Sequence, residues 1–77
     1  MSHTFTDENL LTWEAYASTG NFGLAIEPRI VFNCLSDPSL APRYVERRGD
    51  ESDAEEQVQE LSDQQLRALL RDARPLG

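Results

Sequence analysis

The central stretch of the sequence is Arg29-Ile30-Val31-Phe32-Asn33-Cys34-Leu35-Ser36. Side chains alternate between the two faces of an extended chain, so the apolar residues at even positions share one face and those at odd positions share the other. Pro28 precedes the stretch and Pro38 follows it, which leaves too few residues for a typical helix. A strand that is apolar on both faces belongs in the middle of a sheet.

Two further strands flank this centre. From Leu10 to Ala17, apolar residues recur at every second position, which predicts a strand with one buried face, although Ala, Glu and Leu also suit a helix. A long connection, 18–28, joins it to the central strand and contains turn signals at Gly20 and Gly23. Residues 43–48 predict a third, more polar strand, and its charges suit a sheet edge.

The C-terminal part is predicted to be helical. Ser52 with Glu55 and Ser62 with Gln65 each have the spacing of a capping box, which marks a helix start. The segment is therefore either two short helices, 53–61 and 63–73, or one helix kinked near Ser62. Apolar residues within it recur at helical spacing, which gives each half one face to bury.

These elements predict an α+β fold, a three-stranded antiparallel meander with the helix or helix pair packed on one face, in βββα order. Its length of 77 residues indicates one domain, with a tail and turn at 1–9, the sheet at 10–48 and the helical segment at 52–74. The sheet side of the core is expected to contain Leu11, Trp13, Ala15, Ile30, Phe32, Cys34 and Val45, and its helix side Leu66, Leu69 and Leu70.

The composition is acidic and free of lysine, with a formal net charge of −7. Such a surface suits either a high-salt cytoplasm or a genome biased toward arginine and alanine codons. The single cysteine cannot form a disulfide within the chain and fits a reducing, cytoplasmic compartment. No apolar run is long enough to span a bilayer. We therefore expect a cytoplasmic protein with no membrane partner.

The sequence carries no pattern typical of catalysis, cofactor binding or metal binding. Cys34 lies in an apolar strand, where a thiol is a packing group, and His3 lies in the expected tail. A nucleophile needs an adjacent base, and nothing in the spacing pairs these two residues. The chain also lacks clustered His and Cys ligands and a phosphate-binding loop. We expect no enzyme activity, no cofactor and no metal.

The face of the sheet away from the helices carries the strongest functional signal. Alternation places tyrosine, apolar and arginine side chains there, and such residues are enriched at protein interfaces. Either a partner covers this face, or the 18–28 connection or the N-terminus does. The interface candidates are Tyr16, Val31, Asn33, Leu35, Tyr44 and Arg48.

Two other surfaces suggest partners. Residues 50–63 contain seven acidic residues and no basic one, which indicates a solvated helix start or a docking site for a basic protein. The acidic docking candidates are Asp50, Glu51, Asp53, Glu55 and Glu56. Arginines beside a tyrosine are also typical of modules that bind single-stranded nucleic acid, although a net-negative chain is repelled by phosphates. The residues for that alternative are Arg43, Tyr44, Arg47 and Arg48.

The sequence as a whole therefore predicts a small, non-enzymatic interaction domain. Its partner is an unknown protein or a second copy of the chain, bound through the uncovered sheet face. Binding of single-stranded nucleic acid is the alternative function.

Overall fold

The computed structural model describes residues 2–18, 28–47 and 51–75, with side chains described from residue 54 onward in the last range. It confirms the α+β class, with an antiparallel sheet and two helices in the C-terminal part. The sheet has five strands instead of the predicted three. In chain order the elements are β1 (His3–Thr6), β2 (Thr12–Ser18), β3 (Arg29–Cys34), β4 (Arg43–Glu46), α1 (Glu51–Glu60), α2 (Asp63–Asp72) and β5 (Arg74–Pro75).

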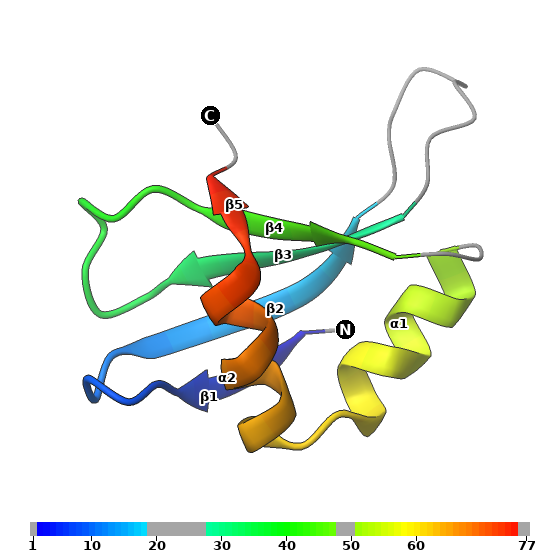
Figure 1. Ribbon diagram of the computed structural model, residues 1–77, viewed down its shortest axis with the longest axis horizontal. Helices are drawn as coiled ribbons and strands as arrows, with labels where there is room; N and C mark the ends of the chain where they lie inside the picture. Colours follow the sequence, from blue (N-terminus) through cyan, green and yellow to red (C-terminus); the bar gives the residue numbers. More distant parts are fainter. Residues whose placement is uncertain (1, 19–27, 48–50, 76–77) are drawn as a thin grey trace.

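The strands lie in the sheet in their chain order, β1-β2-β3-β4-β5, and every neighbouring pair is antiparallel (Figure 1). β3 is therefore the middle strand, as its two apolar faces predict. Its register places Phe32 opposite Ala15 and Ile30 opposite Val45. Phe32 and Ile30 are fully buried, because neighbouring strands flank them on both sides and the helices cover them.

The N-terminal strand β1 replaces the expected tail at 1–9. It pairs with β2, so that Phe5 lies opposite Trp13 and is 2% exposed. The Phe5 ring also meets the Phe32 ring edge to face, with 6.0 Å between ring centroids. One apolar residue between threonines is a weak pattern in the sequence, but this single side chain reaches the core and fixes the strand at the edge of the sheet.

The second edge strand is β5, only two residues long, and it pairs with β4. β4 is therefore an inner strand, and its prediction as an edge strand is wrong. Pro75 has no N–H to donate, which an edge strand tolerates because one side of that strand has no neighbour. Proline cannot continue a helix, and α2 ends before Pro75, at Asp72.

The helical segment consists of two separate helices, which resolves the open choice between a pair and one kinked helix. The second capping box is confirmed, because Gln65 N–H donates to Ser62 Oγ and Ser62 N–H donates to Gln65 Oε1. The first is not, since α1 begins at Glu51 and Ser52 lies inside its first turn. Within the described segments, neither helix has the length and hydropathy that a bilayer-spanning helix needs.

One hydrophobic core joins the two helices to one face of the sheet (Figure 1). The expected core set is confirmed, with Leu11, Val45 and Leu69 only partly buried at its margin. His3 adds a polar link, because its Nδ1 donates to the Val58 carbonyl at 3.0 Å and its Nε2 lies 2.8 Å from Asp63 Oδ1. The buried members of the core are Phe5, Trp13, Ala15, Ile30, Phe32, Cys34, Val58, Leu66 and Leu70.

Candidate functional site

The sheet has a second face, which we call the open face, and neither described helix packs on it (Figure 1). Strand register and alternation assign its residues, since directly opposite residues point to the same side. They are Thr4, Thr6, Thr12, Glu14, Tyr16, Ser18, Arg29, Val31, Asn33, Tyr44, Glu46 and Arg74. The connection 19–27, which the sequence offers as a cover for this face, lies outside the described residues.

The centre of the open face is a row of cross-strand neighbours. Tyr16 on β2 and Tyr44 on β4 both lie directly opposite Val31 on β3. Val31 is only 3% exposed, while both tyrosines are partly exposed. Directly opposite side chains contact one another across a sheet, so the tyrosines contribute to the burial of Val31. Val31 is therefore buried beneath the open face, and the side chains of the two tyrosines form its solvent-exposed surface.

Arg29 extends this row. Its guanidinium carbon lies 4.7 Å from the centroid of the Tyr44 ring, which is the geometry of a cation–π contact. The Arg29 Nε atom is buried and has no hydrogen-bond partner among the described residues. The stacked pair thus places a planar cation and an aromatic ring side by side, a combination that recurs at the energetic centres of protein interfaces.

The predicted interface residues are brought together in part. Tyr16, Val31, Asn33 and Tyr44 share the open face, and Asn33 is partly exposed. Leu35 lies just past the end of β3 and is 49% exposed. The N–H groups of Leu35 and Ser36 both approach the Thr12 carbonyl, at 2.8 and 3.4 Å, which is the two-against-one arrangement of a β-bulge. Leu35 therefore borders the open face. Arg48 lies outside the described residues.

The acidic docking candidates are only partly visible. Asp50 lies outside the described residues, and Glu51 and Asp53 are described only as backbone in the first turn of α1. Glu55 and Glu56 are exposed on α1. Acids near a helix N-terminus are also favoured by the helix dipole, so their positions have a structural reason without any partner.

The nucleic-acid candidates do not share one surface. Arg43 lies opposite Phe32 and so points to the helix side of the sheet, whereas Tyr44 points to the open face. Arg47 Nε donates to Gln57 Oε1 of α1 at 2.7 Å. Arg48 lies outside the described residues. Arg43 and Tyr44 therefore point to opposite faces of the sheet, and the side chain of Arg47 is engaged by α1.

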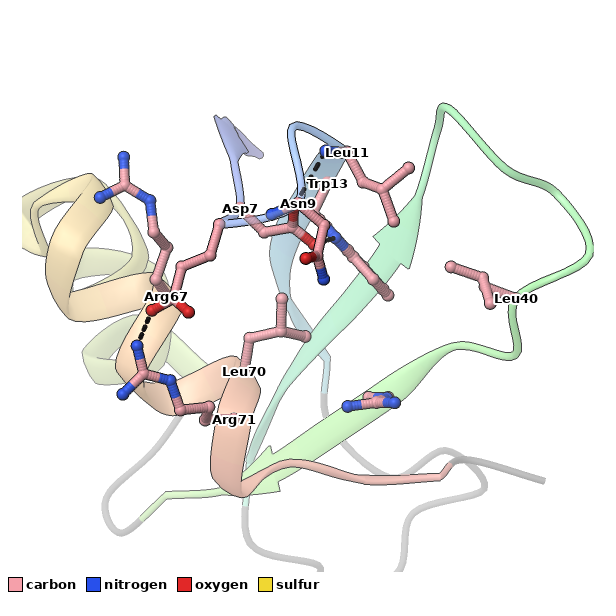
Figure 2. Close-up of a pocket in the computed structure, with 10 residues that line it drawn as sticks. Asp7, Asn9, Leu11, Trp13, Leu40, Arg67, Leu70 and Arg71 are labelled. Carbon is pink, nitrogen blue, oxygen red and sulfur yellow. Dashed lines mark hydrogen bonds and ion pairs between the residues drawn. The ribbon is translucent and has the colours of Figure 1, made fainter.

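A pocket at one end of the molecule was not predicted from the sequence. It has a volume of about 380 Å³ and lies between the β1–β2 turn, the β3–β4 loop and α2. Figure 2 shows Leu70 projecting from α2 on one side, Leu40 from the loop on the opposite side, and Trp13 between them. The three segments are far apart in the sequence, so no local motif announces the pocket.

Asp7 fixes the pocket wall. Its Oδ1 accepts hydrogen bonds from the N–H groups of Asn9 and Leu11, at 2.8 and 2.9 Å, and its Oδ2 accepts one from Trp13 Nε1 at 2.7 Å. Burial raises the pKa of the Asp7 carboxyl, but these hydrogen bonds and the charge of Arg67 outweigh burial and hold the pKa below its ordinary value. The Asp7 carboxylate therefore joins the β1–β2 turn to the indole of Trp13.

Three arginines line the same pocket. Arg67 Nε donates to the Thr6 carbonyl at 2.7 Å. Arg71 forms an ion pair with Glu8, marked by a dashed line at Arg71 in Figure 2. The Arg43 side chain makes no hydrogen bond or ion pair with any residue in the described ranges. The pocket thus combines an apolar wall with one guanidinium, that of Arg43, which has no hydrogen bond or ion pair among the described residues.

The residues considered from the sequence for catalysis or metal binding, His3 and Cys34, lie apart in the described structure. His3 contacts the helices through both ring nitrogens, as described above, and Cys34 is 3% exposed in the core. Residues 2–18, 28–47 and 51–75 contain no group of three His, Cys, Asp or Glu placed to hold a metal ion.

No protein-family model matches the sequence, and neither the curated proteins nor the solved structures searched contain a match to it.

Proposed function

We propose that this chain is a small, non-enzymatic protein-interaction module that acts through its open face, and that its partner there is a second copy of the same chain. The observation that carries the proposal is the row of Tyr16, Val31 and Tyr44, with Arg29 stacked on Tyr44. Tyrosine and arginine dominate the energetic centres of interfaces, because each buries a large area while its polar groups stay hydrogen-bonded.

The charge of the open face supports a second copy as the partner. Two like chains of net charge −7 repel one another over most of their surface. The described residues of the open face contain two glutamates, Glu14 and Glu46, and two arginines, Arg29 and Arg74, so their charges cancel. Two copies that meet through this face add no like-charge repulsion at the contact itself, and opposite charges are available for pairing across a symmetric contact.

The proposal includes a cytoplasmic location, which rests on the single cysteine and its burial in the core. It does not include nucleic-acid binding, since Arg43 and Tyr44 point to opposite faces of the sheet and the chain is acidic.

The test is the dependence of molecular mass on concentration, measured by sedimentation velocity for wild type and for Asn33→Arg. Asn33 is partly exposed in the middle of the open face, so an arginine there obstructs a face-to-face contact and removes no buried apolar group. The substitution also lowers the net negative charge, so a loss of association cannot come from stronger general repulsion. We expect wild type to shift from monomer to dimer as concentration rises, and Asn33→Arg to stay monomeric. Its melting temperature should equal that of wild type at concentrations where both are monomeric, because dimerisation itself raises the melting temperature.

Asn9→Arg is the matched control, because it makes the same chemical change at an exposed turn position away from the open face. It should dimerise like wild type. A wild type that remains monomeric at every concentration would overturn the second-copy proposal, as would an Asn33→Arg variant that dimerises normally.

A further inference from the structure

The pocket between the β1–β2 turn, the β3–β4 loop and α2 is independent of the open face, and its charge is opposite to that of the chain. The whole sequence has 14 acidic residues and seven arginines. The pocket is lined by three of the arginines, Arg43, Arg67 and Arg71, but by only two acids, Asp7 and Glu8. Its lining therefore has a net charge of +1 in a molecule of −7, which favours an anion there over a cation.

The charged groups of the lining differ in how far they are already engaged. Asp7 accepts three hydrogen bonds from its own hairpin, and Glu8 forms an ion pair with Arg71. Arg67 uses its Nε for the Thr6 carbonyl. Arg43 is exposed and has no such partner among the described residues. A guanidinium presents a planar fork of donors that matches a carboxylate, so Arg43 is the group that would hold an anion.

The rest of the wall is apolar. Trp13 and Leu70 are 4% and 6% exposed and form its floor, while Leu11 and Leu40 lie nearer the solvent. A volume of about 380 Å³ falls within the range of pockets that hold small ligands. A ligand that matches both the Arg43 guanidinium and the apolar wall has one anionic group and a compact apolar body.

We propose that this pocket binds a small monocarboxylic acid with an apolar body, with its carboxylate on Arg43 and its body against Trp13 and Leu40. The net lining charge of +1 matches a single negative charge. A phosphate monoester brings close to two negative charges near pH 7 and meets the carboxylates of Asp7 and Glu8, so it fits less well. In the test, inorganic phosphate competes with the carboxylic acid, which shows whether the pocket prefers a phosphate or a carboxylate.

Trp13 is the only tryptophan in the chain and part of the pocket floor, so its fluorescence reports occupancy directly. The probe is 3-phenylpropionate, and its uncharged counterpart is 3-phenylpropionamide. We expect a saturable change in Trp13 emission with the acid, and binding weaker by about tenfold or more with the amide, because the amide loses the charge-assisted pair with Arg43. Added salt should weaken binding of the acid, since the guanidinium is exposed.

Arg43→Gln should weaken binding of 3-phenylpropionate by about tenfold or more, because it removes the charged fork and keeps the side-chain length similar. The matched control is Arg74→Gln, an exposed arginine on the neighbouring strand β5 that does not line this pocket. It should bind like wild type, and a thermal melt of each variant checks that the fold is kept.

Three results would overturn the assignment. They are no saturable change with 3-phenylpropionate up to millimolar concentrations, equal binding of acid and amide, and unchanged binding by Arg43→Gln. Competition by inorganic phosphate at concentrations as low as those of the acid would also refute a carboxylate site. None of these results depends on whether the chain dimerises through its open face.

Discussion

At the scale of single residues, Asp7 shows how one side chain can fix both a turn and a pocket wall. Its three hydrogen bonds come from the Asn9 and Leu11 backbone and from the Trp13 indole. The sequence marks Asp7-Glu8-Asn9 as a turn, because Asp and Asn favour such positions. It gives no sign that the same carboxylate also contacts Trp13, since that contact depends on the hairpin that β1 and β2 form.

Asp7→Asn should lower the free energy of unfolding at neutral pH by about 1 kcal/mol. The asparagine amide is uncharged and has one oxygen in place of two, so it cannot accept all three hydrogen bonds that the carboxylate accepts. The folded-state pKa of Asp7 lies below the ordinary value of 3.8 for an aspartate, so its stabilisation is present above that pH and is lost as pH falls through the lower folded pKa. Urea denaturation at neutral and acidic pH measures the effect. Wild type and variant should converge in acid, and a constant difference across the range would contradict this role.

Leu10 is strained where it stands. Among the described residues it is the only non-glycine with a positive φ, 65°, and its side chain is 82% exposed. Leu10→Gly removes a β-carbon that this conformation disfavours and sacrifices no buried area, so it should raise the free energy of unfolding by up to about 1 kcal/mol. Leu40→Gly is the control at an exposed leucine without positive φ, and it should be destabilising. Urea denaturation that finds Leu10→Gly less stable than wild type would contradict the strain.

At the scale of elements, the alternation of apolar residues predicts the three inner strands well. β3 is the clearest because both of its faces are apolar, and the inner face of β2 is a regular series. Apolar alternation does not predict the two edge strands. β1 offers only Phe5 to the core, and β5 is a two-residue strand whose pairing depends on where α2 ends. Edge pairing is decided by neighbours in space, which a local pattern does not contain.

The helix starts show the same contrast. The Ser62–Gln65 capping box depends only on nearby residues, so the sequence predicts it. The Ser52 signal predicts a helix that begins at residue 53, whereas α1 begins earlier, at Glu51. Ser62→Ala should lower the free energy of unfolding by about 1 kcal/mol, because the first turn of α2 loses a hydrogen-bond acceptor. Urea denaturation of Ser62→Ala, Gln65→Ala and the double variant tests this. If the two residues act as one box, the double variant should lose less than the sum of the single losses; strict additivity would contradict the box.

At the scale of the whole molecule, one thin core holds the sheet to its helices. Phe32 lies at its centre, fully buried on the middle strand and in edge contact with Phe5. Phe32→Ala should cost about 3–5 kcal/mol, from the lost burial and the cavity left behind. A chain of 77 residues has little stability beyond that, so we expect a calorimetric scan without a cooperative transition. A variant that melts as wild type does would contradict the central position of β3.

The candidate surfaces follow from this arrangement to different degrees. Because the helices cover one face, the alternation of β2, β3 and β4 is enough to assemble Tyr16, Val31 and Tyr44 on the other. Alternation alone does not predict that Val31 is buried between its neighbours or that Arg29 stacks on Tyr44. The pocket could not be predicted at all, since its three segments meet only once the sheet has formed and α2 has packed on it.

The central claim, that the open face is the contact surface, is tested most directly by the two tyrosines. Tyr16 and Tyr44 are the only tyrosines in the chain and both lie on that face, while the single tryptophan, Trp13, lies on the helix side. With fluorinated tyrosine and tryptophan, fluorine NMR follows all three rings over a dilution series. We predict that the two tyrosine signals shift with concentration along one common binding curve, while the tryptophan signal stays in place. Tyrosine signals that do not change at any concentration, or a tryptophan signal that moves with them, would contradict the claim.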